Sequence, residues 1–310
     1  MNLIERLGTA KTNWLAGREL DRKDCADTKL WVPSALALVK AGIYRAITAI
    51  IQLEGGGLHA DIGCGQGLQL EALDEHTPDS ILIGVDRNRT MIEAATNFLS
   101  LTPKGASKHF RRRLSQGQSG TQVCYEPDRG LKRLAKQGLT PADPIRLIGD
   151  DMQNLTVLKA LLNGRLLDSA SIMLPGMAYA SVFSASAEIR STVEIVNRMQ
   201  GGAGALDFIK WTVVREACQQ LVGLIKPGGR LITAETMVLL EQPSFEDMLQ
   251  TYYHQIGDAL AHFTPEHFDF IDLPAETTQG QGLSWTPQGA STLDVSKIQQ
   301  KVGLTVATRN

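Results

Sequence analysis

Residues 58–67 read LHADIGCGQG, and this stretch decides the fold. Its short apolar start predicts a buried strand at 58–61, and helical spacing follows over 66–75. The glycines between them lack a Cβ, so the backbone can turn sharply and a ligand can press against the main chain. A strand, a glycine-rich turn and a helix in this order predict a nucleotide-like ligand at the turn.

Outward from this segment, short apolar runs alternate with stretches of helical spacing. The expected strands lie at 81–85, 145–149, 169–174 and 230–234, and the expected helices lie at 89–100, 155–163, 184–199 and 205–225. Strands that alternate with helices of this length specify a mostly parallel sheet with helices on both faces. Right-handed crossovers then give a doubly wound α/β domain.

The two ends of the chain are expected to add to this core. A helical segment over 1–54, with its main helix at 34–52, is expected to cover the ligand site of a domain over 55–310. Residues 237–310 would form the substrate side of that domain. The elements predicted there are a helix at 244–261, a strand at 268–273, a loop-rich stretch at 275–291, a helix at 293–301 and a strand at 303–309.

Two acidic residues stand at strand ends next to the glycine turn. Asp61 closes the first strand, and Asp86 follows the second. Open α/β sheets bind ligands at the carboxyl ends of their strands, near the point where the strand order reverses. A carboxylate at the end of the second strand is therefore placed to accept hydrogen bonds from two ribose hydroxyls.

Five segments together resemble class I S-adenosylmethionine-dependent methyltransferases over residues 55–236. They are HADIGCGQG at 59–67, IGVDRN at 83–88, IGDDMQNL at 148–155, SIMLPG at 171–176 and LIKPGGRLI at 224–232. The resemblance implies the fold of that class, a mostly parallel seven-stranded sheet with helices on both faces, here with an insertion before the third strand. It also implies S-adenosylmethionine as the cofactor and S-adenosylhomocysteine as the product. Nicotinamide-binding proteins carry a GxGxxG turn instead.

The resemblance implies a role for the residues around the glycine turn. Asp61 would lie near the ammonium end of the cofactor, and Leu174 would lie beside its methionine portion. The residues that would form the turn against the sugar and methionine parts are Gly63, Cys64, Gly65 and Gly67.

The second and third segments are implied to bind the nucleoside. Asp86 would hold the ribose, and Arg87 would flank the adenine. Asp151 would take the adenine amino group, a role that the adjacent Asp150 could fill instead. Met152 would pack on the adenine ring.

The reaction class leaves the methyl acceptor open. Methyl transfer from a sulfonium needs a nucleophile held close and in line, and it needs a base only if the acceptor arrives protonated. Tyr179 and His254 are the candidate catalytic residues, His254 as a base because imidazole titrates near neutral pH, with packing in a helix as its alternative role. Residues 174–177, LPGM, lack the (N/D)PP(Y/F) tetrapeptide of enzymes that methylate amino groups of nucleic acids. We therefore expect methylation of a small molecule at oxygen or nitrogen.

The insertion at 101–144 is basic, with nine Lys or Arg against three Asp or Glu. Connections at this place are normally a few residues long, so the insertion is an addition to the core. Three interpretations stay open: a solvated excursion, a site for an anionic small substrate, and a surface whose Lys and Arg contact RNA phosphates. The alternative functions are therefore an RNA methyltransferase that uses this insertion and a non-catalytic S-adenosylmethionine-binding module.

Composition sets the remaining expectations. Four scattered cysteines without a CxxC pair are typical of reduced thiols in a cytoplasmic protein. The chain starts without the apolar run of a signal peptide, and no apolar run approaches the roughly 20 residues that span a bilayer, so no membrane partner is expected. His254, His262 and His267 are spaced by eight and five residues, which does not match a metal-ligand pattern, and no metal is expected.

Overall fold

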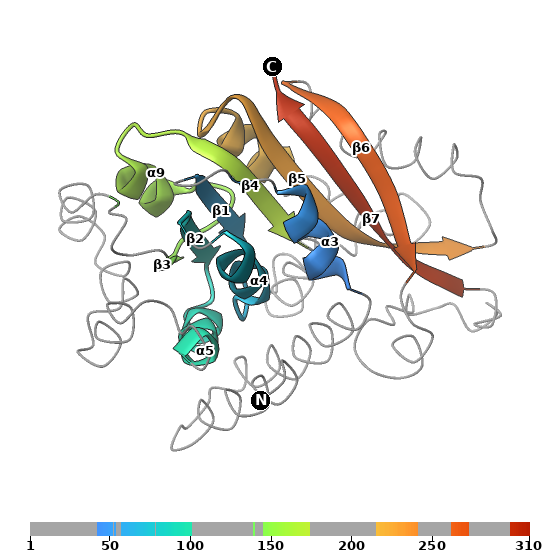
Figure 1. Cartoon of the computed structure of the whole chain (residues 1–310), viewed down its shortest axis with the longest axis horizontal. Coiled ribbons are helices and arrows are strands. Elements are labelled where there is room, and N and C mark those ends of the chain that lie inside the picture. Colours follow the sequence, from blue (N-terminus) through green and yellow to red (C-terminus); the bar gives the residue numbers. More distant parts are fainter. Residues whose placement is uncertain are drawn as a thin grey trace, which may run out of the picture.

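The structure is a computed structural model that describes residues 42–51, 53, 57–77, 79–100, 139, 145–173, 215–240, 262–272 and 298–310. Within these residues one seven-stranded sheet has the order β3-β2-β1-β4-β5-β7-β6 (Figure 1). Its strands are β1 Leu58–Ile62, β2 Ile81–Asp86, β3 Ile145–Gly149, β4 Leu167–Met173, β5 Ile225–Leu240, β6 Phe263–Asp272 and β7 Ile298–Arg309. The first five strands pair in parallel, and β7 is antiparallel to both β5 and β6.

Helices cover both faces of this sheet (Figure 1). On one face lie α3 Ile43–Ile50, α4 Leu68–His76 and α5 Arg89–Ser100, whose apolar side chains form one buried cluster with β2, β3, β5 and β7. On the other face lie α9 Thr156–Leu162 and a helix at 215–222, in a second buried cluster with β1, β2 and β4. Because both faces are covered, β1 and β3 are buried along their whole lengths.

The central elements confirm the fold class expected from the sequence. β1, β2 and α5 start at the predicted residues, and β3 has the predicted bounds. β5 and β6 are longer than expected: β6 begins at Phe263, and β5 runs from Ile225 to Leu240, so the helix expected over 205–225 ends at 222 instead. The predicted helices at 184–199 and 244–261 lie outside the described residues, as does the loop-rich stretch at 275–291. Of the insertion at 101–144, the structure describes Leu139 alone.

Two predicted helices are corrected by the structure. The helix expected over 34–52 does not run through Gly42, whose φ of +74° is left-handed, and α3 begins only at Ile43. The helix expected over 293–301 is wrong from Ile298 onward, because β7 starts there and pairs with β5 on one side and β6 on the other. Residues 297–301, KIQQK, are compatible with a helix by local propensity, but backbone pairing to two neighbouring strands overrides that preference.

A charged contact joins the starts of three parallel strands. The Asp168 carboxylate in β4 accepts the Leu58 N–H at 2.6 Å and lies 2.5 Å from Lys226 Nζ. Partial burial raises the pKa of Asp168, but these two partners and the charge of Arg165 together lower it more, so the net shift is downward. In the KPGG segment at 226–229, which lies within β5, the second glycine is needed for close packing, because a Cβ at Gly229 would lie 2.6 Å from Ile225 Cγ2.

Gly84 in β2 lets α4 and the glycine turn lie close to the sheet. A Cβ at this position would lie 2.6 Å from Leu147 Cδ2, 2.6 Å from Leu70 Cδ1 and 3.0 Å from Cys64 Sγ. Such distances are inside van der Waals contact, so the interior has no room for a methyl group here. The absence of a side chain at Gly84 therefore sets the distance between the sheet and the turn that follows β1.

We predict that Gly84→Ala lowers the free energy of unfolding by about 1–3 kcal/mol, because the added methyl overpacks the core. Gly223→Ala is the control, since the nearest described neighbour of a Cβ there, the Gln220 carbonyl oxygen, would be 3.9 Å away. Denaturant unfolding of both variants measures the difference. Equal midpoints for the two variants would contradict this account of α4 packing.

Candidate functional site

Three segments meet at one edge of the sheet. β1, β2, β3 and β4 pair in parallel, so their carboxyl ends lie at the same edge. The turn at 63–67 follows β1, Asp86 ends β2, and residues 150–154 follow β3. β1 lies between β2 and β4, which is the point where the chain reverses its direction of strand addition. This is the position at which doubly wound sheets bind ligands.

The turn after β1 is held against the end of β2 by its backbone. The N–H groups of Gly63 and Cys64 both donate to the Val85 carbonyl oxygen, at 2.7 and 2.9 Å. Gly63 and Gly65 have φ angles of +75° and +50°, which residues other than glycine rarely adopt. Among the described residues, a Cβ at Gly65 would meet nothing within 4 Å, which leaves space beside this backbone for a ligand.

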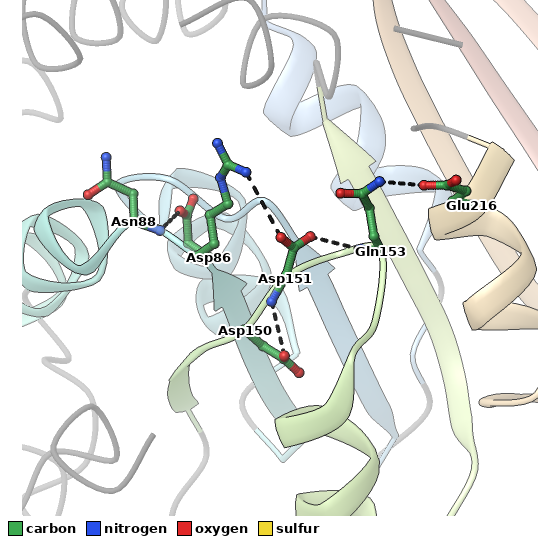
Figure 2. Close-up of polar contacts among 7 residues, drawn as sticks. Asp86, Asn88, Asp150, Asp151, Gln153 and Glu216 are labelled. Carbon is green, nitrogen blue, oxygen red and sulfur yellow. Dashed lines mark hydrogen bonds and ion pairs between the residues drawn. The ribbon is translucent and has the colours of Figure 1, made fainter. Parts of the chain in front are cut away.

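Asp86 connects the turn to β2. Its Oδ2 accepts the Gly65 N–H at 3.0 Å. Its Oδ1 accepts the Asn88 N–H at 2.8 Å, the contact that Figure 2 shows. Two backbone donors on different segments therefore fix the orientation of the carboxylate. Each carboxylate oxygen carries two lone pairs, so accepting one N–H leaves that oxygen able to accept from a hydroxyl as well.

Asp61 is the buried acid of the site, with an exposed fraction of 2%. Its Oδ1 accepts a hydrogen bond from Ser171 Oγ at 2.8 Å. The pKa of Asp61 is raised to about 7, chiefly by burial. The nearby charge of Asp86 also raises this pKa, and the Ser171 hydrogen bond lowers it. Cys64, next to both acids, is buried, and burial raises the pKa of its thiol, so it stays protonated.

The two adjacent acids after β3 have different partners. Asp150 accepts the Asp151 N–H on Oδ1 at 3.0 Å and the Leu158 N–H on Oδ2 at 2.9 Å, so it binds the first turn of α9. Asp151 accepts the Gln153 N–H on Oδ1 at 3.0 Å, and its Oδ2 lies 3.9 Å from Arg87 Nη1 (Figure 2). The side chains of Asp151 and Arg87 are each about one-third exposed. Of the two acids, Asp151 is the one that faces the end of β2.

The remaining expected residues divide into described and undescribed ones. Met152 is buried, and its Cε would lie 3.5 Å from a Cβ at Gly63, so its thioether lies beside the turn. Leu174, Tyr179 and His254 lie outside the described residues, and their proposed roles stay predictions.

The structure adds contacts that sequence reasoning missed. His59 in β1 and Ser171 in β4 form a buried polar chain to Asp61. Gln153 Nε2 donates to Glu216 Oε2 and so links the segment after β3 to the helix at 215–222 (Figure 2). A histidine inside an otherwise buried strand was a readable signal, because a buried polar group requires hydrogen-bond partners. The identity of those partners depends on strand register, which the sequence does not reveal.

No protein-family model and no curated protein matches this sequence. Among solved structures, geranyl diphosphate C-methyltransferase from Streptomyces coelicolor A3(2) is 12% identical, with a TM-score of 0.46 over 97% of this chain and 88% of that chain. A S-adenosylmethionine-dependent methyltransferase from Geobacter sulfurreducens is 12% identical, with a TM-score of 0.43 over 86% of this chain and 90% of that chain.

The strand order β3-β2-β1-β4-β5-β7-β6, with β7 antiparallel to its neighbours, is that of the class I methyltransferase fold expected from the sequence. A fold hosts many activities, so the function depends on the chemistry of the site residues. Among the described helices, none is long and apolar enough to cross a membrane.

We predict that Asp150→Ala destabilises the protein by about 1–2 kcal/mol, because the first turn of α9 loses its acceptor. Asp150→Asn retains one acceptor oxygen and is expected to lose less. Denaturant unfolding distinguishes the three proteins. Stability unchanged by Asp150→Ala would mean that this carboxylate does not support α9 and is available for a ligand.

Proposed function

We propose that this protein binds S-adenosylmethionine and transfers its methyl group to an oxygen or nitrogen of a small molecule. The observation that carries the proposal is the hydrogen bond from Gly65 N–H to Asp86 Oδ2. It joins a glycine turn, whose backbone at Gly65 has open space beside it in the described part of the chain, to a carboxylate suited to ribose hydroxyls. Both lie at the edge of the sheet where doubly wound folds bind nucleotides.

The residues present fit the three parts of this cofactor. Asp86 would hold the ribose hydroxyls, and the backbone at Gly65 would lie against the sugar and methionine parts. Asp61 would accept the ammonium group, because a buried acid gains most from a cationic partner. Asp151, with Met152 beside the turn, would bind the adenine. When bound, the cofactor supplies an electrophilic methyl group on a sulfonium.

The polypeptide's own task is to hold an acceptor in line with that methyl group. β4 ends at Met173, opposite Ala234 of β5, whereas β5 continues to Leu240 and pairs there with β7. β7 in turn pairs with β6 as far as Asp272. This antiparallel extension projects past the carboxyl ends of the parallel strands (Figure 1). It supports the proposal that residues 237–310 provide the acceptor side, with His254 or Tyr179 as candidate groups for moving a proton.

We predict that Asp86→Ala weakens S-adenosylhomocysteine binding more than tenfold in calorimetry. Its carboxylate would be the acceptor for ribose hydroxyls, and hydrogen bonds to a charged group contribute about 1.5–3 kcal/mol. Asp79→Ala is the matched control, because it removes the same charge from an exposed turn. Unfolding of each variant is measured alongside, to separate lost binding from lost folding. Equal affinity for Asp86→Ala and the control would refute the proposed ribose site.

The acceptor class has its own test. We expect the release of S-adenosylhomocysteine when the enzyme is supplied with S-adenosylmethionine and a small oxygen or nitrogen nucleophile. We also expect no tight RNA binding at 50 mM salt. RNA binding that falls steeply between 50 and 200 mM salt would favour the RNA methyltransferase instead. Cofactor binding without any methyl transfer across the acceptor panel would favour the non-catalytic module.

A further inference from the structure

A chain of four polar side chains crosses from β4 to β1 beneath the glycine turn. The strand register places His59 opposite Ser169 and Asp61 opposite Ser171. Alternate residues of a strand share a face, so these four side chains lie on the same side of the sheet. His59 Nδ1 lies 2.7 Å from Ser169 Oγ, His59 Nε2 lies 3.1 Å from Ser171 Oγ, and Ser171 Oγ lies 2.8 Å from Asp61 Oδ1.

All four side chains are buried, with exposed fractions of 3% or less. Burial lowers the pKa of His59 to about 3, so the imidazole is neutral at ordinary pH. A neutral imidazole has one N–H donor and one bare nitrogen acceptor. Each contact in the chain must therefore have a definite donor and acceptor.

The charge of Asp61 sets the direction of every hydrogen bond. An ionised carboxylate only accepts, so the single hydroxyl proton of Ser171 points to Asp61. Ser171 Oγ can then only accept from His59, which requires the proton of His59 to be on Nε2. Nδ1 is left bare and accepts from the Ser169 hydroxyl. With the proton on Nδ1 instead, lone pairs of Nε2 and Ser171 Oγ would face each other at 3.1 Å.

We propose that His59 and Ser171 are positioning residues for Asp61: a one-way hydrogen-bonded chain orients the carboxylate and favours its ionised form at the cofactor's ammonium end. Because the Ser171 proton is held toward Asp61 by the His59 N–H behind it, the carboxylate keeps one orientation. The inference rests on the proposed function only in naming the cofactor's ammonium as the partner of Asp61. The hydrogen-bonded chain from Ser169 to Asp61 does not depend on a bound cofactor.

The other titratable groups described around Asp61 do not favour its ionised form. Asp86 on β2 is the charged neighbour, and its charge raises the pKa of Asp61. Tyr44 on α3 and Cys64 in the turn also face Asp61, and burial raises the pKa of both, so they stay uncharged. Among the described groups that shift the pKa of Asp61, Ser171 is the one whose hydrogen bond favours the ionised carboxylate.

The pH dependence of binding follows from the sign of the Asp61 shift. Its pKa is raised to about 7, so the carboxylate is largely protonated below that pH and ionised above it. An ammonium group binds the ionised form. The affinity for S-adenosylhomocysteine is therefore expected to rise as the pH rises from 6 to 8. 5′-Methylthioadenosine, which lacks the amino-acid part, is the control ligand and should not show this rise.

The first experiment reads the tautomer of His59 in the free protein. Long-range ¹H–¹⁵N correlation spectra of histidine-labelled protein at pH 8 are compared with those of His59→Gln, whose missing signals identify His59. We expect the neutral tautomer protonated on Nε2. Protonation on Nδ1 at this pH, or a charged ring, would overturn the proposed chain.

The second experiment measures S-adenosylhomocysteine affinity against pH for matched variants. Ser171→Ala removes the donor to Asp61, so the pKa of Asp61 rises and binding at pH 6.5 weakens about tenfold for each unit of that rise. The loss should shrink toward pH 8.5, and Ser171→Thr should restore the native profile because it keeps the hydroxyl. His59→Gln keeps an N–H near the position of Nε2, whereas His59→Leu removes it and should shift the profile as Ser171→Ala does.

The two experiments separate this inference from the proposed function. If S-adenosylhomocysteine does not bind the native protein, the proposed function fails, and the tautomer still tests the chain. If it binds with a pH profile that Ser171→Ala leaves unchanged, the inference fails while the function stands. A Ser171→Ala loss that is equal at all pH values would indicate a merely structural role and would also overturn the inference. If Ser171→Ala does not fold, the inference is tested by the His59 tautomer and by the comparison of His59→Gln with His59→Leu.

Discussion

The site depends on one backbone carbonyl, that of Val85 at the end of β2. It accepts two N–H groups from the turn after β1 and so holds that turn beside the neighbouring strand. Only in this position does the Gly65 N–H reach the Asp86 carboxylate, which in turn is oriented for a ligand at the same edge. Gly84, one residue before Val85, leaves room for the turn and α4 to approach. The positions of the site's side chains thus depend on the backbone geometry of two adjacent strands.

Much of this arrangement could be predicted from the sequence, because periodicity and glycine turns are local signals. The positions of β1, β2, β3 and β4 along the sequence, and the position of Asp86 at the end of β2, follow from such signals. The end of the chain could not be predicted in the same way: β7 begins at Ile298 because β5 and β6 supply backbone partners from distant segments. The choice between Asp150 and Asp151 was also open, since it depends on which carboxylate meets the first turn of α9.

The buried chain from Ser169 to Asp61 shows why register matters for function. Four polar groups inside a covered sheet are tolerated only when each has a partner, and the one-to-one pairing of β1 with β4 provides those partners. A shift of one residue between the strands would turn these side chains to opposite faces and leave Asp61 without Ser171. An apolar core would be simpler to pack than four buried polar groups. The proposed role of Asp61 gives a reason for these groups, because they orient its carboxylate.

The antiparallel pairing of β5, β7 and β6 separates the fold into two halves that can change independently. Its hydrogen bonds connect backbone to backbone and continue beyond the last residue of β4. Substitutions on the projecting part therefore need not disturb the turn at 63–67 or Asp86, which depend on β1 and β2. Under the proposed function, such a division lets the acceptor side vary in sequence while the turn at 63–67 and Asp86 keep their backbone contacts.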